Sequence, residues 1–231
     1  MANRGLFVTF EGGEGAGKST QVGLLRRRLE DEGRRVVQLR EPGGTKFGEE
    51  LREILLSSSK LATRTELLLF LAARSELVDK MIKPALSAGI DVICDRFIDS
   101  TLAYQGYGRG LDLDLIRTLN DSVIDGCAPD VTVLLDIDPD VGLHRVSEES
   151  AGDAIEGHWQ AGLSLQEAGA AKGKRVGGRD AAFHRKVRRG YLSIAKAEPG
   201  RVLLLDATRA EEDLATAIWQ RVEEARAAKD S

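Results

Sequence analysis

The chain has 231 residues, of which 42% are hydrophobic and 30% are charged, a composition typical of a folded globular protein. Its 37 acidic residues outnumber its 33 Lys and Arg residues, and the net charge of −4 argues against a nucleic-acid coat or a membrane-surface binder. Two cysteines are too few for a disulfide framework, and no apolar stretch is long enough to span a bilayer or resembles a signal peptide. We therefore expect a cytoplasmic protein with two buried thiols and with neither nucleic acid nor membrane as a partner.

Short apolar runs alternate with longer amphipathic stretches along the chain. The runs lack polar alternation, as strands buried on both faces of a parallel sheet do. They are Leu6–Phe10, Val36–Leu39, Asp91–Cys94, Val131–Asp136 and Val202–Leu205. The stretches with apolar residues at helical spacing cover 18–32, 47–57, 64–87, 112–125, 139–149, 183–197 and 210–228. This alternation predicts a doubly wound α/β fold, with a five-stranded parallel sheet flanked by helices.

A glycine-rich loop follows the first predicted strand. Residues 12–19 fit the P-loop pattern G-x-x-x-x-G-K-[ST] and lead directly into the first predicted helix. Glycines let backbone N–H groups surround the β-phosphate of ATP, Lys18 adds a charge between the β- and γ-phosphates, and the Ser19 hydroxyl can bind Mg²⁺. Thr20 caps the helix or contacts the α-phosphate. The predicted ATP site is Gly12, Gly13, Glu14, Gly15, Ala16, Gly17, Lys18, Ser19 and Thr20.

Arginines near the ends of the predicted strands indicate a second phosphorylated substrate. Asp95 and Arg96 directly follow the third strand, Arg40 follows the second, and Arg74 lies in the helix before the third. Ligands of open α/β sheets bind at this edge, and guanidinium groups bind phosphate bidentately. The alternative for each arginine is a surface ion pair, and for Asp95 a strand cap. The guanine-reading motif Asn-Lys-x-Asp is absent from the sequence, which disfavours a GTPase.

Several longer motifs follow one another in a fixed order. They are Phe10-Glu11-Gly12, Arg40-Glu41-Pro42-Gly43-Gly44-Thr45, Phe70-x-x-x-Arg74, Asp95-Arg96-Phe97, Ser100-Thr101, Tyr104-Gln105-Gly106, and Leu135-Asp136-x-x-Pro139 with Arg145. In this order they resemble the motifs of bacterial thymidylate kinase, through residues 5–145 and again at 183–192 and 206–208. The resemblance implies transfer of the γ-phosphoryl of ATP to dTMP, giving dTDP for dTTP biosynthesis, with Mg²⁺. It also implies a nucleoside-monophosphate-kinase fold in a single domain over 1–231, and a homodimer formed through the helices at 64–87 and 112–125.

The resemblance also implies roles at the base and sugar of dTMP. Phe70 would stack on thymine, although ordinary core packing is the alternative for this residue, and Arg74 would donate to the O4 atom of the base. Tyr104 would lie against the 2′ face of the sugar and exclude ribose, and Glu11 would accept from the 3′-hydroxyl or lie beside the metal. The implied dTMP-binding residues are Glu11, Arg40, Pro42, Phe70, Arg74, Arg96, Ser100, Thr101, Tyr104 and Gln105.

The phosphates of both substrates are likewise given partners by the resemblance. Arg40 and Arg96 would bind the dTMP phosphate, with Arg96 bridging to the γ-phosphate of ATP. Asp95 would orient Arg96 or hold a Mg²⁺-bound water, and Arg145 would stack on adenine. Because the acceptor phosphate oxygen is already ionised, catalysis is mainly positioning and charge neutralisation, and no general base is required.

Two alternatives to this function stay open on sequence grounds. One is another P-loop kinase that acts on a deoxynucleoside or on a different pyrimidine monophosphate. The other is a non-catalytic, ATP-dependent switch. The set of arginines argues against the switch, because a switch has no need of a second phosphate site.

A glycine-rich insertion at 150–178 is expected to form part of a mobile lid over about 145–180. Glu14 cannot stabilise negative charge on the transferring phosphoryl group, so a cation must come from a segment that closes over the nucleotides. The basic run at 172–179 is the nearest candidate, and Arg175 and Arg179 are the residues expected to supply that cation. They complete the predicted catalytic set with Lys18, Asp95 and Arg96.

Replacing Arg175 or Arg179 with alanine is expected to lower kcat by at least ~30-fold and to change the KM for dTMP little, because the lost interaction is made mainly in the transition state. Steady-state kinetics of both single variants and of the double variant measure this. Near-normal kcat in the double variant would show that the run is a solvated surface loop. The catalytic cation would then have to come from Arg145 or from residues 185–189.

Overall fold

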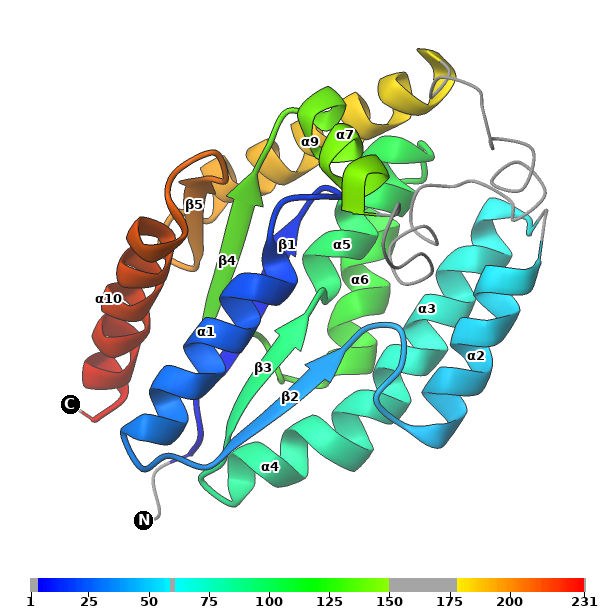
Figure 1. The fold of residues 1–231 in the computed structure, drawn as a ribbon. Coiled ribbons are helices and arrows are strands. Elements are labelled where there is room, and N and C mark those ends of the chain that lie inside the picture. The colour runs from blue at the N-terminus through cyan, green and yellow to red at the C-terminus, as the bar shows by residue number, and fades with distance from the viewer. Residues whose placement is uncertain (1–3, 59–60, 150–177, 231) are drawn as a thin grey trace.

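The computed structural model describes residues 4–58, 61–149 and 178–230. Five parallel strands form one sheet in the order β2-β3-β1-β4-β5 (Figure 1). They are β1 (Phe7–Gly12), β2 (Val36–Arg40), β3 (Asp91–Asp95), β4 (Val131–Asp136) and β5 (Val202–Asp206). All five predicted strands are confirmed, each within two residues at either end.

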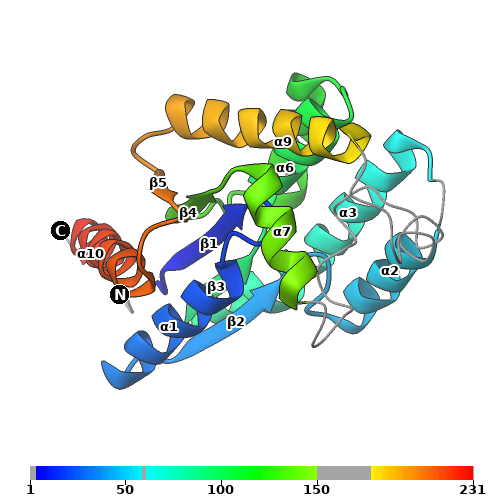
Figure 2. The same cartoon turned by 45° about the horizontal axis from the view of Figure 1, so that its top comes forward.

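Helices cover both faces of the sheet, which confirms the doubly wound prediction. They are α1 (Lys18–Asp31), α2 (Lys46–Ser57), α3 (Thr63–Leu77), α4 (Lys83–Ser87), α5 (Ile98–Thr101), α6 (Leu113–Ile124), α7 (Pro139–Glu149), α9 (Gly178–Ala197) and α10 (Glu211–Asp230). Helices α1 and α10 pack together on one face, and α9 crosses the opposite face beside α6 (Figure 2). Among the described helices, none combines the length and the apolar character that a membrane span requires.

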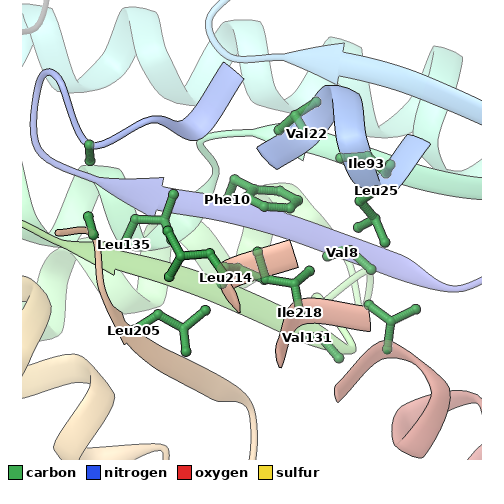
Figure 3. Packing of buried hydrophobic residues seen from close by; sticks show 14 of the residues in the cluster. Val8, Phe10, Val22, Leu25, Ile93, Val131, Leu135, Leu205, Leu214 and Ile218 are labelled. Carbon is green, nitrogen blue, oxygen red and sulfur yellow. The ribbon is translucent and has the colours of Figure 1, made fainter. Parts of the chain in front are cut away.

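The period-two alternation of the strands divides the core between the two faces. Val8 and Phe10 of β1 point toward α1 and α10, where they pack against Leu25 and Ile218 (Figure 3). Phe7, which directly precedes Val8 and so points to the other face, belongs to a second cluster that includes Leu86 of α4. The three central strands β1, β3 and β4 are buried on both faces, which is why their sequences are apolar with little polar alternation, whereas the edge strands β2 and β5 are partly exposed.

Strand pairing sets where the two predicted substrate sites lie. The register of β1 against β3 places Phe10 opposite Asp95, and the register of β2 against β3 places Arg40 opposite the same residue. The P-loop that leaves β1 therefore begins beside the Asp95–Arg96 pair that ends β3. Both predicted sites share the carboxyl edge of the sheet.

Two helical predictions were incomplete. The predicted helix at 64–87 is three segments, because a π-helical turn (Val78–Ile82) separates α3 from α4, and Pro84, which has no backbone N–H, stands at the start of α4. The segment after Arg96 was predicted as neither helix nor strand, yet it forms α5 and a π-helical stretch (Leu102–Gly108). Residues 99–106 are all buried, so they show no polar face from which a helical period could be read.

The remaining sequence expectations have mixed outcomes. Cys94 and Cys127 are both buried and free, as predicted. Helix α9 begins at Gly178, five residues before the predicted start at 183. Residues 150–177 of the insertion, Arg175 among them, lie outside the described residues, and only the backbone of Arg179 is described.

Candidate active site

The P-loop connects β1 to α1 with backbone conformations that suit glycine. Gly15 and Gly17 have φ values of +65° and +81°, in the left-handed region that side chains rarely adopt. A Cβ at Gly15 would also overlap the carbonyl oxygen of Gly142, because α7 packs directly against the loop. Gly17 is the N-cap of α1 and makes no side-chain cap, so Thr20 lies inside the first turn and does not cap the helix as one reading proposed.

Lys18 folds back into the loop. Its Nζ donates to the carbonyl oxygens of Gly12 at 3.3 Å and Gly13 at 3.0 Å, and the residue is only 9% exposed. Burial lowers the pKa of Lys18, and the nearby Arg96 lowers it further, while Asp95 opposes the shift. The ammonium group therefore lies where charges from β1, β3 and the P-loop meet.

Arg96 joins the P-loop to the end of β3. Its Nη1 donates to Gly12 O at 3.1 Å and its Nη2 to Glu14 Oε1 at 3.0 Å, while the ring of Tyr104 lies 5.3 Å from the guanidinium carbon. The backbone of Arg96 has φ +69°, a strained value for a residue other than glycine. The contacts of its side chain with Gly12, Glu14 and Tyr191 hold Arg96 in this conformation.

Glu14 has a different place from the one the sequence suggested. The sequence placed Glu14 in the ATP site and gave it no partner; in the structure it is the acidic partner of Arg96, and it also accepts from the Tyr104 hydroxyl at 3.3 Å. Arg96 and Tyr104 are both predicted residues of the second-substrate site. Glu14 therefore brings the P-loop into contact with that site.

Glu11 lies behind the site and not in it. Its carboxylate is fully buried and accepts from Phe97 N at 2.8 Å, from Ser100 N at 3.2 Å and Oγ at 2.6 Å, and from the Tyr191 hydroxyl at 2.7 Å. The expectation that Glu11 accepts from a substrate hydroxyl or lies beside the metal is therefore corrected, because its oxygens are enclosed by protein donors. Burial raises the pKa of Glu11 to about 7, with a further contribution from Asp99.

Arg74 is the centre of a second buried network. It is 1% exposed, and its five N–H groups donate to Glu41 Oε2 twice, to Thr101 Oγ1, to Asn120 Oδ1 and to Phe97 O, at 2.6–3.0 Å. A thymine O4 must therefore share or replace one of these acceptors. Arg74 thus ties α3 to the ends of β2 and β3, to α5 and to α6.

Among the other predicted dTMP-site residues, Phe70 and Gln105 are buried, whereas Arg40 is exposed. Phe70, one turn before Arg74, is 7% exposed and belongs to none of the three hydrophobic clusters of the described residues. Gln105 is buried and donates to Glu66 at 2.7 Å. Arg40 stands apart from the buried residues, because its side chain is 44% exposed and pairs with Glu49 at 3.3 Å.

Two backbone and side-chain features complete the predicted set. The peptide bond before Pro42 is cis. Arg145 of α7 donates to Gly15 O at 3.3 Å and to Ala207 O at 3.4 Å, so it lies between the P-loop and the turn after β5. This position is compatible with stacking of Arg145 on adenine. The stacking itself stays a prediction.

Three residues of these networks were not assigned from the sequence. Glu41 was quoted as part of a motif but given no role. Asn120 interrupts the buried stripe formed by Ile116 and Ile124 of α6, and this interruption was the available indication. Tyr191 gave no indication, because it reads as one more apolar position of an amphipathic helix.

The residues present fit Mg²⁺, which prefers oxygen ligands and usually keeps several waters alongside one or two carboxylates and substrate phosphates. Ser19 is exposed in the first turn of α1. Asp95 has a buried oxygen, Oδ1, with no hydrogen-bond partner among the described residues. No cluster of three or more His, Cys, Asp or Glu residues in the described ranges could hold a metal alone, which suits an ion that arrives with ATP.

Comparison with known proteins gives one consistent family. The family model for thymidylate kinase matches residues 10–159. The chain is 44% identical to a thymidylate kinase of Deinococcus radiodurans, over 96% of this chain and 98% of that protein, and 47% identical to one of Synechococcus sp. JA-3-3Ab, over 94% and 95%. The crystal structure of thymidylate kinase from Ehrlichia chaffeensis superposes with a TM-score of 0.70 at 35% identity, covering 94% of this chain and 98% of that one.

Replacing Glu11 with glutamine should flatten part of the pH dependence of stability. A carboxyl whose pKa is raised from 4.5 to about 7 stabilises the fold below pH 4.5 and loses that contribution as the pH rises through 7. Between pH 5 and 8 the free energy of unfolding of the parent protein should therefore fall by roughly 2–3 kcal/mol relative to that of Glu11→Gln. Urea titrations at both pH values measure this difference. The exposed Glu30→Gln serves as a control, and a Glu11→Gln profile parallel to it would contradict the assignment.

Proposed function

The chain belongs to the thymidylate kinase family, whose reaction transfers the γ-phosphoryl group of ATP to dTMP, and we propose that here the transfer takes place between the P-loop and Arg96. The enzyme is a dTMP kinase that supplies dTDP for dTTP biosynthesis. The observation that carries the proposal is the hydrogen bond from Arg96 Nη1 to Gly12 O, because it joins the cation of one substrate site to the phosphate loop of the other.

We assign the ATP side to the P-loop, Lys18 and Arg145. Backbone N–H groups of the loop and the positive end of the α1 dipole surround the phosphates. Lys18 exchanges its bonds to the loop carbonyls for bonds to phosphate oxygens. Arg145 supports adenine from its position beside Ala207.

We assign the base of dTMP to Phe70 and Arg74, together with Ser100, Thr101 and Gln105 at the edge of the pocket. The network around Arg74 fixes its guanidinium plane before the base arrives, and O4 shares or replaces one of the acceptors of that network. Pro42 shapes the turn that follows β2.

The sugar and phosphate of dTMP are assigned to the residues around Arg96. Tyr104 lies at the 2′ face, and Glu14, which contacts both Tyr104 and Arg96, replaces Glu11 as the acceptor for the 3′-hydroxyl. Arg96 binds the phosphate, and Arg40 reaches it from β2 after releasing Glu49.

The chemistry that these residues perform is orientation and charge neutralisation. The attacking atom is an ionised phosphate oxygen of dTMP, and the γ-phosphoryl group lies between Lys18 and Arg96 as it moves. Ser19 and Asp95 would hold Mg²⁺, directly or through its waters, and the ion would supply positive charge along the phosphates. The lid over 145–180, within a single kinase domain at 1–231, adds the cation from Arg175 or Arg179.

The substrate range tests the proposal against its alternatives. An ADP-release assay should show turnover with dTMP, weaker turnover with dUMP and little with thymidine. A missing methyl group changes discrimination by only ~1–3 kcal/mol, whereas a missing 5′-phosphate leaves Arg40 and Arg96 without their ligand. Thymidine used as well as dTMP would indicate a nucleoside kinase, and ATP binding without turnover of any of these acceptors would indicate a switch.

We also propose a cytoplasmic homodimer formed through α3 and α6. These helices pack together, and they carry Leu68 and Leu115, which are 58% and 45% exposed in the single chain. Apolar side chains exposed to this extent on neighbouring helices suit an interface between copies.

Sedimentation velocity should give twice the 25.1 kDa mass of the chain, and Leu68→Asp should shift the protein toward the monomer, because a carboxylate is costly to bury at an apolar contact. Leu204→Asp, at a position on β5 that is 46% exposed, is the matched control. A monomeric parent protein, or a dimer unaffected by Leu68→Asp, would place the interface elsewhere or remove it.

A further inference from the structure

Tyr191 belongs to α9, which lies on the face of the sheet opposite to α1 and α10. Its side chain reaches the site from that face and is 3% exposed. Its hydroxyl donates to Glu11 Oε2 at 2.7 Å, lies 2.9 Å from Ser100 Oγ, and accepts from Arg96 Nη1 at 3.3 Å. One oxygen atom therefore contacts β1, α5 and the residue that follows β3. None of the roles derived above uses it.

The chemistry of a phenol limits how these contacts divide. The hydroxyl has one proton and two lone pairs, so when its proton points to the Glu11 carboxylate, to which Ser100 Oγ also donates, a lone pair accepts from Arg96. Burial raises the pKa of Tyr191, which keeps the phenol protonated. In a buried, low-dielectric place, a hydrogen bond of this kind orients its partner more strongly than it would in water.

The two halves of the Arg96 guanidinium have different partners. Nη1 is bonded to neutral acceptors, the Gly12 carbonyl and the Tyr191 hydroxyl, whereas Nη2 is bonded to the carboxylate of Glu14. An incoming phosphate oxygen competes most directly with another anion. The Nη1 half can thus stay in place while the Nη2 half changes its partner.

We propose that Tyr191 is a positioning residue of the phosphoryl-transfer reaction: its hydroxyl holds the Nη1 half of Arg96 against the P-loop, so that the Nη2 half is presented to the phosphoryl group. This inference rests on the proposed role of Arg96. In this proposal, helix α9 fixes the orientation of the guanidinium group of Arg96, the residue that follows β3.

Tyr191→Phe removes the hydroxyl alone and keeps the ring, whose edge packs against Tyr104 with centroids 6.2 Å apart. We expect kcat to fall about 10-fold and the KM for dTMP to change less than about 3-fold, because an unfixed arginine loses most where charge develops. Tyr107→Phe is the matched control. Tyr107 lies in the π-helical stretch that also contains Tyr104 and packs against Gly190 of α9, next to Tyr191, so this variant should keep the parent kcat. Turnover is measured at a temperature at which circular dichroism shows all variants folded.

Arg96→Lys, alone and combined with Tyr191→Phe, separates positioning from packing. Lysine keeps the charge but has no forked pair of nitrogens, so Tyr191→Phe should cause less than about a 2-fold further loss in this background. A full, multiplicative loss in the double variant, or a normal kcat in Tyr191→Phe while Arg96→Lys is impaired, would overturn the role of Tyr191 and leave the proposed function standing. Full activity of Arg96→Lys would instead overturn the role of Arg96 itself.

Discussion

The pairing of β1 with β3 is the constraint on which the rest of the site depends. Since the two strands are parallel and adjacent, the loop that follows one and the arginine that follows the other begin at the same level. A ligand held by the first is within reach of a ligand held by the second. Phosphoryl transfer needs this arrangement because it is achieved mainly by placing two charged substrates in line.

That arrangement crowds charge into a buried region, and the structure compensates by pairing. Glu11, Lys18, Glu41, Arg74 and Arg96 are all nearly inaccessible to solvent, and each would be costly if left alone. Glu41 and Arg74 neutralise one another, and Arg96 is opposed by Glu14. Burial and the nearby Asp99 raise the pKa of Glu11 to about 7, although the hydrogen bonds that it accepts from Ser100 and Tyr191 act in the opposite direction. Removing one member of such a pair leaves a buried charge without compensation, so these residues tolerate change poorly.

The parts of the fold that could be predicted are those specified by local sequence. The five strands and the P-loop follow from apolar runs and from glycine and lysine at fixed spacing, and the structure confirms both. The break of the helix after α3 and the buried segment after Arg96 could not be read, because neither leaves a clear periodic pattern. The role of Tyr191 depends on Glu11, which is 180 positions away in the chain, and no local pattern encodes such a contact. The environment of Glu11 and the pairing of Glu14 with Arg96 could not be read for a related reason: the bend of the loop between the two residues decides where each side chain points.

The ion pair between Glu14 and Arg96 has a consequence for selectivity among anions. Without substrate, the cation already has an internal counter-ion, so the site does not present an unsatisfied positive charge to the solution. A small anion that enters must displace a tethered carboxylate and gains little by doing so, even when it is abundant. A nucleotide brings stacking and hydrogen bonds at its far end, which offset the exchange. From this internal ion pair we expect chloride and inorganic phosphate to compete weakly for Arg96, while a ligand that carries a base still binds.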